Sequence, residues 1–261
     1  MWAEEIGEGE AAEAQYRTKE WYNKGVGFWE KVEASVDGVL GGYGHVNGRD
    51  VKDSNEFLVD ILGERLTQNR HLVALDCGAG VGRVTKNLLL KHFQEVDLVE
   101  PVSHFIESAR ENLKVCGQSK SVANHAVNFY CIPLQEFTPE EGRYDVIWIQ
   151  WCIGHLTDAD FVAFFNRAKV GLKPEGFFVL KENVARNGFV LDKEDHSVTR
   201  SDTYFRDLFK QAGLYLYKIK AQKGFPQELF PVKMYALTTE PPAIMQDVSH
   251  ERRSKRRTKK S

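Results

Sequence analysis

The pattern of hydrophobic and polar positions changes at about residue 71. Before it, apolar positions three and four residues apart predict an amphipathic helix over 51–66. After it, short apolar runs alternate with amphipathic segments, which predict helices over 83–92, 103–115, 159–172 and 203–212. The predicted strands are seven: HLVALDC, EVDLVE, VNFYCIP, YDVIWIQW, GFFVLKENV, LYLYKIKA and VKMYALTT. This alternation predicts an α/β protein with a seven-stranded, mostly parallel open sheet. A loop joins the last two strands, which predicts an antiparallel pair at one edge.

The same pattern divides the chain into a single domain with two tails. Residues 1–14 are rich in Glu and poor in apolar residues, so they are predicted to be disordered. The domain is predicted over 15–239. It comprises N-terminal helices and a glycine-rich loop over 15–66, followed by the α/β core over 71–239. Residues 240–261 are predicted to form a disordered basic tail.

Composition and charge narrow the class of protein. Hydrophobic residues make up 42% and charged residues 28%, as in a globular protein with a core. No apolar run approaches the roughly 18 residues of a membrane span. The acidic N-terminus does not resemble a secretory signal, so an intracellular protein without a membrane partner is expected. The net charge is −2, but the last twelve residues hold seven Lys or Arg and one Glu. An acidic body favours cationic partners, whereas a basic tail favours acidic surfaces or an import receptor.

The four cysteines predict neither a metal site nor a disulfide framework. Cys77, Cys116, Cys131 and Cys152 are widely spaced and contain no CxxC pair. Three of them lie in or beside apolar runs, so they are interpreted as reduced, buried packing residues. No clustered His, Asp and Glu set has the spacing of metal ligands, and no metal is expected.

The strongest local motif is LDCGAGVGR at 75–83. A predicted strand ends, Gly78, Gly80 and Gly82 follow, and a helix begins. Glycine lets the backbone turn sharply and approach a ligand, although a tight turn without a ligand would look the same. Glu100 ends the next predicted strand, where a carboxylate can accept hydrogen bonds from both ribose hydroxyls of a nucleoside. These residues alone leave NAD and other nucleoside cofactors open.

The motif and its following acid resemble the class I methyltransferases, whose first motif reads DxGxGxG. The resemblance implies a Rossmann-like methyltransferase sheet with an N-terminal helical extension. It also implies S-adenosyl-L-methionine as cofactor and S-adenosyl-L-homocysteine as product. In that reading Leu134 and Gln135 hold the adenine, Gln150 lies near the methionine portion, and Arg83 pairs with the cofactor carboxylate. A surface cation is the alternative for Arg83. The implied cofactor-binding set is Gly78, Gly80, Gly82, Arg83, Glu100, Pro101, Leu134, Gln135 and Gln150.

Four longer segments carry a narrower resemblance over 26–237. GVLGGYGHV, LDCGAGVGR, YDVIWIQWCIGHLTD and KENVARNGFVLDKEDHSVTR are similar to the eukaryotic protein α-N-terminal methyltransferases. These enzymes methylate the α-amine of N-termini of the Xaa-Pro-Lys type, exposed after removal of the initiator methionine. The resemblance therefore implies an enzyme whose partners are proteins with such N-termini.

The chemistry of an α-amine fits the residues in these segments. Its pKa is near 8, so it must lose a proton before it attacks a methyl group. His155 and Asp195 are suitable bases, and Asn183 can orient the amine through its side-chain oxygen. The resemblance places these three catalytic residues around the amine. A core histidine and a solvated loop carboxylate are the alternatives for the first two.

The resemblance also implies an apolar slot for proline and an acidic pocket for lysine. Trp151 offers a flat face for the proline ring, and Trp29 and Leu40 close around it. Asp192 and Asp195 pair with the lysine ammonium, and Ser197 assists. The aromatic residues could equally be core. The loop over 38–44 could be a lid over the cofactor or a connector, and Phe230 stands where a tyrosine of the family contacts the peptide.

Several alternatives remain at this point. A methyltransferase of the same fold could act on a lysine side chain or a small-molecule amine, and a non-catalytic scaffold could retain the fold. A nucleic-acid enzyme is disfavoured because the expected site is acidic, so no specific nucleic-acid partner is expected. The tail resembles a nuclear localisation signal, which predicts a nuclear and cytoplasmic protein.

Overall fold

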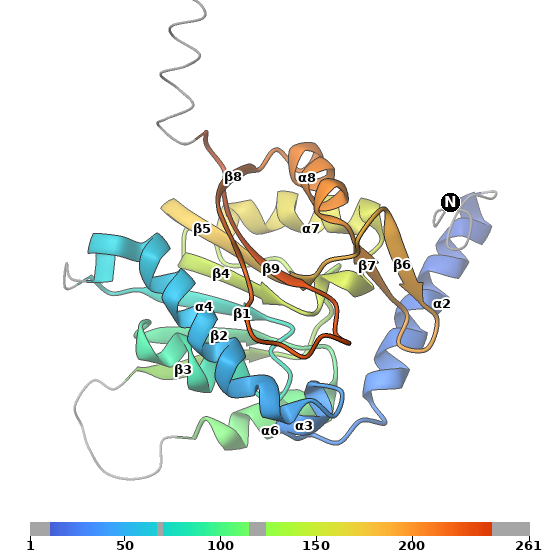
Figure 1. Cartoon of the computed structure of the whole chain (residues 1–261), viewed down its shortest axis with the longest axis horizontal. Coiled ribbons are helices and arrows are strands. Elements are labelled where there is room, and N and C mark those ends of the chain that lie inside the picture. The colour runs from blue at the N-terminus through green and yellow to red at the C-terminus, as the bar shows by residue number, and fades with distance from the viewer. Residues whose placement is uncertain (1–10, 67–69, 115–123, 242–261) are drawn as a thin grey trace, which may run out of the picture.

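A seven-stranded sheet forms the centre of the molecule (Figure 1). The computed structural model describes residues 11–66, 70–114 and 124–241. The strands are β1 Val73–Cys77, β2 Glu95–Val99, β3 His125–Tyr130, β4 Tyr144–Gln150, β5 Leu172–Asn183, β8 Tyr215–Ala221 and β9 Val232–Thr238. Their order in the sheet is β3-β2-β1-β4-β5-β9-β8. The first five are parallel, whereas β9 runs antiparallel to both β5 and β8. All seven predicted strands and the antiparallel edge pair are confirmed.

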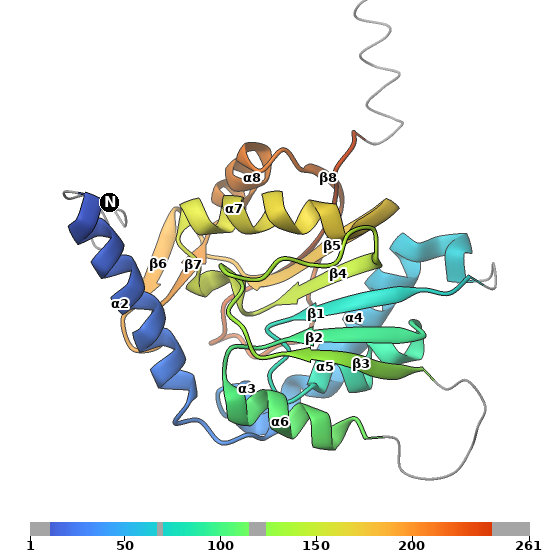
Figure 2. The ribbon, with the colours of Figure 1, turned by 180° about the vertical axis from the view of Figure 1, so that it is seen from behind.

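Helices cover both faces of the sheet (Figures 1 and 2). On one face, α7 and α8 bury a phenylalanine-rich cluster against the strands. On the other, α4, α5 and α6 bury a second apolar cluster. Burial on both faces explains why all seven residues of β4 are buried and why its sequence is nearly continuous in apolar residues. The α-helices that cover the sheet are α4 Asn47–Leu62, α5 Arg83–Asn87, α6 Ser103–Asn112, α7 Asp158–Ala168 and α8 Asp202–Gln211.

The predicted helices exist, but some of their bounds differ. The helix predicted over 51–66 begins at Asn47 and ends at Leu62. The one predicted over 83–92 is divided at Leu88, whose φ of −125° leaves the helical region, into α5 and a 3₁₀ turn. The 3₁₀ turns are η1 Gly44–Val46, η2 Gly63–Leu66, η3 Leu89–Lys91, η4 Ile153–His155 and η5 Lys169–Gly171.

A two-stranded hairpin was missed by the sequence analysis. Strands β6 Phe189–Asp192 and β7 Ser197–Arg200 pair antiparallel outside the main sheet, in a region interpreted as a loop. Their connection contains Asp195, which the structure therefore places in a hairpin turn. The hairpin lies beside α2 Ala11–Trp29 in both views of the chain (Figures 1 and 2). Trp21 of α2 packs against Val198 of β7 and joins the two elements.

The N-terminal segment is more ordered than predicted. Helix α2 begins at Ala11, inside the segment interpreted as disordered; residues 1–10 lie outside the described part of the chain. The glycine-rich loop forms the short helix α3 Val36–Val39 followed by η1. Ser35 caps α3 by accepting the backbone N–H of Gly38 at 3.0 Å. The predicted basic tail falls almost wholly outside the described residues. None of the helices that the structure describes is long and apolar enough to cross a membrane.

Candidate active site

The glycine loop after β1 forms the base of the site at the carboxyl end of the sheet. Gly78, Gly80 and Gly82 have φ of 67°, 53° and 77°, a region that favours glycine. A Cβ on Gly78 would lie 2.3 Å from the Cβ of Cys152, so this glycine allows β1 and the end of β4 to approach closely. A Cβ on Gly82 would lie 2.9 Å from a methyl of Leu113, so that glycine serves helix packing. Of the three, Gly78 and Gly80 line a cavity.

Glu100 accepts two backbone hydrogen bonds, one of them from this loop. One carboxylate oxygen accepts the N–H of Gly80 at 2.9 Å, and the other accepts the N–H of Val102 at 3.0 Å. The side chain is 6% exposed, and it lines the same cavity. Burial raises its pKa to about 7, although both backbone hydrogen bonds act in the opposite direction. The predicted ribose ligand is therefore a buried carboxyl whose two oxygens are already held by backbone N–H groups.

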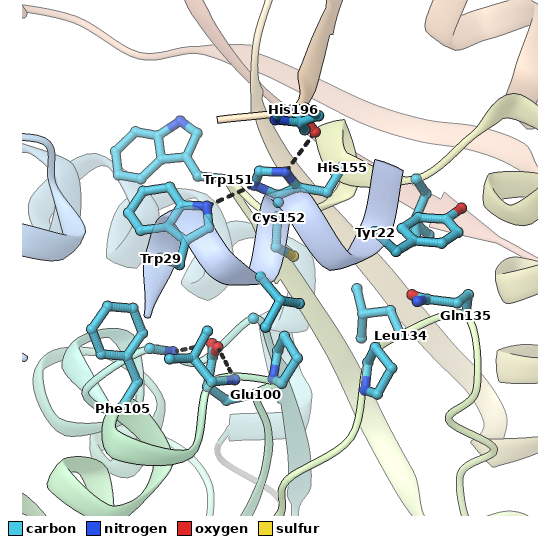
Figure 3. A pocket seen from close by; sticks show the side chains of 18 of the residues that line it. Tyr22, Trp29, Glu100, Phe105, Leu134, Gln135, Trp151, Cys152, His155 and His196 are labelled. Carbon is cyan, nitrogen blue, oxygen red and sulfur yellow. Dashed lines mark hydrogen bonds between the residues drawn. The ribbon is translucent and has the colours of Figure 1, made fainter. Parts of the chain in front are cut away.

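The first cavity lies where the sequence predicts the cofactor (Figure 3). Its walls include the predicted residues Gly78, Gly80, Glu100, Pro101, Leu134 and Gln135. Aromatic residues of α2 complete it: Trp21, Tyr22 and Trp29. Trp29 was predicted as a substrate contact, whereas Trp21 and Tyr22 were not predicted as site residues. The cavity meets the ends of β1, β2 and β4, where an open α/β sheet binds ligands. Its mostly apolar lining and its buried carboxyl fit a nucleoside-containing cofactor.

Arg83 and Gln150 are directed towards Asp50 of α4. The guanidinium of Arg83 donates to Asp50 at 2.5 Å, and the Gln150 amide donates to the same carboxylate at 2.9 Å. Lys181 forms a third contact with it at 2.5 Å. Burial favours neutral Asp50, but the charges of Lys181 and Arg83 outweigh burial and hold its pKa below the ordinary value. Neither Arg83 nor Gln150 lines the first cavity, so their roles as cofactor ligands stay predictions.

A second cavity shares a wall with the first. Trp29, Trp151 and His155 line both cavities. The second is also lined by the predicted residues Leu40, Asn183, Asp195 and Ser197 and by Phe230. Asp192 does not line it; its side chain is exposed and accepts the N–H of Glu194 within the hairpin turn. From the glycine-rich segment, Val39 lines both cavities, whereas Leu40, Gly41 and Tyr43 line the second.

Trp151 has an unusual backbone at the end of β4. Its φ is 53°, which is rare for a bulky residue and typical of functional positions. Its backbone N–H donates to the carbonyl of Lys181 at 3.1 Å. The indole Nε1 is buried and has no hydrogen-bond partner within the described ranges. The strained turn therefore holds a flat ring and a free donor between the two cavities.

His155 is held on both sides of its ring (Figure 3). Trp29 donates its indole N–H to Nε2 at 3.1 Å, and Nδ1 lies 3.0 Å from the carbonyl of His196. An indole only donates and a carbonyl only accepts, so these partners assign the neutral tautomer with the proton on Nδ1. Burial also lowers the pKa of His155, and the charge of Asp195 opposes this shift. The ring is therefore neutral and positioned.

Glu182 is a site residue that the sequence analysis missed. It precedes Asn183 at the end of β5, is 5% exposed and lines the second cavity. One oxygen accepts the N–H of Asn183 at 2.9 Å, whereas Oε2 is buried without a partner among the described residues. Asp195 likewise has one buried carboxylate oxygen without such a partner. Adjacent polar residues at the end of an apolar strand were the available signal, and only Asn183 was taken from it.

The cysteines differ in their burial. Cys77 is buried and Cys152 partly buried, but Cys131 is exposed, so its interpretation as a buried packing residue is wrong. It lies just beyond the end of β3, which is an edge strand of the sheet that the structure describes. Cys116 lies outside the described residues. Among the residues that the structure describes, no three His, Cys, Asp or Glu side chains gather as a metal site.

Comparison with known proteins gives consistent matches. Residues 17–238 match the family described as AdoMet dependent proline di-methyltransferase. The alpha N-terminal protein methyltransferase 1 of Arabidopsis thaliana is 63% identical over 263 residues, covering 99% of this chain and 91% of the relative. The N-terminal Xaa-Pro-Lys N-methyltransferase 1 of Homo sapiens is 42% identical over 219 residues, covering 84% and 96%. A SAM-dependent methyltransferase structure from Leishmania major has a TM-score of 0.78 at 38% identity, covering 91% of this chain and 89% of that one.

Proposed function

The chain belongs to the family of AdoMet-dependent proline di-methyltransferases, and on this premise we propose that it methylates the α-amino group of protein N-termini. The proposed substrates expose Xaa-Pro-Lys after removal of the initiator methionine. The name of the human relative gives N-terminal Xaa-Pro-Lys as the sequence on which that protein acts. One structural observation carries the proposal. The cofactor-type cavity and a second cavity with two incompletely paired carboxyls meet at Trp151 and His155.

The first cavity is the proposed site of S-adenosyl-L-methionine. When bound, this cofactor supplies a methyl group on a positively charged sulfur. Glu100 would accept hydrogen bonds from the ribose hydroxyls, while Leu134 and Gln135 would enclose the adenine. Arg83 would pair with the cofactor carboxylate, for which it must share its charge between that group and Asp50. The apolar aromatic wall from α2 would exclude water from the transferring methyl group.

The second cavity is the proposed site of the acceptor N-terminus. Asp195 supplies a carboxylate for the amine, and Asn183 supplies a side-chain oxygen at the end of β5. Catalysis then consists mainly of removing a proton and aligning the nitrogen with the methyl group. His155 would act as a base only after giving up the hydrogen bond from Trp29, because Nε2 already accepts that donor. We therefore assign His155 first to positioning.

Selection of the second and third substrate residues follows from the same cavity. Trp151, Leu40 and Trp29 form a flat apolar wall suited to a proline ring, and the free indole N–H of Trp151 suits a peptide carbonyl. Asp195 and Ser197 face the cavity and would contact the lysine side chain. Asp192 would act from outside the cavity, through its charge at the exposed hairpin turn.

Mass spectrometry of a Ser-Pro-Lys peptide tests the proposal. The peptide is incubated with the protein and S-adenosyl-L-methionine, next to an N-acetylated copy. Mass gains in steps of one methyl group on the free peptide alone support transfer to the α-amine. Gains on both peptides would move the acceptor to the lysine side chain. No gain on either, with cofactor binding intact, would favour a small-molecule amine or a scaffold without catalysis.

We further propose that the basic tail directs the protein to the nucleus as well as the cytoplasm through an import receptor. Support comes from the charge of residues 251–261 alone, which stand outside the described structure. Deleting 251–261 should alter the distribution of a fluorescent fusion in cells and leave peptide turnover in vitro unchanged. An unchanged distribution would remove the import role, and a large loss of turnover would assign the tail to substrate binding.

A further inference from the structure

The two carboxyl oxygens of Glu182 differ in their hydrogen bonding. Its side chain is 95% buried, and its Oε1 already accepts the backbone N–H of Asn183. Oε2 has no hydrogen-bond partner in the described part of the chain, although it belongs to a residue that lines the second cavity. A buried carboxyl oxygen without a donor costs free energy. Because Glu182 lines the cavity, a substrate group that reached this oxygen with a donor would remove that cost.

The groups around Glu182 leave its charge incompletely balanced. Burial, with a smaller contribution from the charge of Asp195 in the hairpin turn, raises its pKa to about 8. Arg200 of β7 and the N–H of Asn183 act in the opposite direction. The charge of Glu182 also acts on Cys152 and Tyr235. The pKa values of both groups are raised, so both are neutral near pH 8 and cannot balance the charge of Glu182. A cation brought into the cavity would complete this balance.

His155 also lines the cavity and could in principle accept a proton, but both of its ring nitrogens are already hydrogen-bonded. Both ring nitrogens of His155 have protein partners, which fixes the ring as neutral without a vacant nitrogen. Glu182 and Asp195 instead each retain a buried carboxyl oxygen without a partner, and both line the second cavity. The cavity therefore offers two carboxyls to a cationic group, one from β5 and one from the hairpin turn.

We propose that Glu182 is the second carboxyl of the acceptor site, which binds the cationic α-ammonium of the substrate and takes its proton. This inference rests on the function proposed above and adds a catalytic residue to it. The side chain of Asn183 remains available to orient the nitrogen, because Glu182 uses only the backbone N–H of that residue. The same carboxylate then faces the methylated ammonium that each transfer produces.

The proton and the methyl group move in two balanced steps. The α-ammonium gives one proton to the Glu182 carboxylate, leaving a neutral amine and a carboxylic acid. The amine lone pair then forms a bond to the methyl carbon while the carbon–sulfur bond breaks, giving a methylammonium and a thioether. Glu182 releases its proton to solvent before a further transfer. A carboxyl and an amine of similar pKa, both near 8, exchange a proton at little cost.

Binding of a trimethylated Ser-Pro-Lys peptide tests the proposal without requiring turnover. Its N-terminus carries a permanent charge and no proton, so any pH dependence between pH 7 and 9 arises from the protein. Cation binding requires ionised Glu182, so we expect the wild-type affinity to rise with pH over this range, approaching tenfold. In Glu182→Gln the rise should disappear, and affinity at pH 9 should fall at least tenfold.

Two controls isolate the effect. The N-acetylated peptide, which has no charge at its N-terminus, should bind wild type and Glu182→Gln alike. Glu141→Gln changes an exposed glutamate at the opposite end of β4 and should behave as wild type. Unchanged cofactor affinity shows that each variant is folded. Equal affinity and equal pH dependence of the trimethylated peptide in wild type and Glu182→Gln would overturn the proposal.

Turnover separates this proposal from the proposed function. With the free peptide at pH 7, kcat of Glu182→Gln should fall at least tenfold while cofactor affinity stays unchanged. If wild type itself transfers no methyl group to the free peptide, the proposed function fails. If wild type transfers and Glu182→Gln matches its kcat, the function stands and Glu182 is not the proton acceptor.

Discussion

Trp29 of α2 donates its indole N–H to Nε2 of His155, 3.1 Å away. From the other side, the His155 ring donates to the carbonyl of His196 in the hairpin turn. A second tryptophan of α2, Trp21, donates to the backbone carbonyl of His155 at 2.8 Å. The N-terminal helix and the hairpin thus fix the orientation of a residue that follows β4. The extension is therefore part of the active site, because it positions a group on the wall between both cavities.

Replacing Trp29 with phenylalanine should release the His155 ring. The aromatic wall is retained, but Nε2 loses a donor that requires it to be unprotonated. We expect the pKa of His155 to rise towards its ordinary value and peptide turnover to fall about tenfold, consistent with the loss of one positioning hydrogen bond. Proton NMR titration of the ring measures the first effect. Trp21→Phe is the matched control, because it removes a donor to the His155 backbone and leaves the ring nitrogens paired. Equal titration in both variants would contradict the positioning role.

The ribose assignment of Glu100 predicts how cofactor affinity varies with pH. Its pKa of about 7 means that the carboxyl is mainly neutral at pH 6 and ionised at pH 8. The ionised form accepts hydrogen bonds from ribose, so cofactor affinity should rise as pH increases through 7. In Glu100→Gln this pH dependence should disappear, and Glu100→Ala should weaken binding at least tenfold. Calorimetric titration at several pH values measures both. Unchanged affinity in Glu100→Ala would defeat the ribose assignment.

Asp195→Asn should separate transfer from cofactor binding. The amide retains the size of the carboxyl but provides neither a negative charge nor a proton acceptor. We expect methyl transfer to slow by roughly 10² or more, because the amine loses a carboxylate that aligns it with the methyl group, with cofactor affinity near wild type. Single-turnover mass spectrometry and cofactor titration provide the two measurements. Transfer at the wild-type rate would remove Asp195 from the mechanism.

The sheet and the cofactor loop could be predicted because their signals are local. The apolar residues of β4 are contiguous in sequence, and the positive φ of Gly78 and Gly80 accompanies a residue type that permits it. The position of Glu100 follows from the same regularity, because parallel strands end at one edge. Boundaries were less accurate at Asn47, where helix α4 begins without a side-chain cap.

The remaining features depend on contacts between distant residues. The cofactor role of Arg83 stays a prediction, but its contact with Asp50, 33 positions away, could not be foreseen from the sequence. Asp192 and Asp195 look equivalent in sequence, but the hairpin turn exposes one and directs the other into the cavity. Glu182 could be recognised only when the burial of its free oxygen was known. Tertiary packing decides each of these cases.

Asp50 balances two buried cations, and its removal should be costly. The carboxylate is 1% exposed and contacts both Arg83 and Lys181. Asp50→Asn leaves these cations without their anion, so the free energy of unfolding should fall by about 3–5 kcal/mol. Asp60→Asn, also on α4, is the matched control. It breaks an exposed pair with Lys218 of β8, and its cost should stay below about 1 kcal/mol. Urea denaturation measures both.

The same variant tests the predicted cofactor contact of Arg83. If the cofactor carboxylate binds beside Arg83, it supplies an anion where Asp50→Asn has removed one. Saturating S-adenosyl-L-methionine should then raise the melting temperature of Asp50→Asn by more than it raises that of wild type. Adding Lys181→Met to Asp50→Asn removes one of the excess cations and should recover part of the lost stability. An equal thermal shift in wild type and Asp50→Asn would place the cofactor carboxylate away from Arg83, with Asp50 as the permanent partner of that guanidinium.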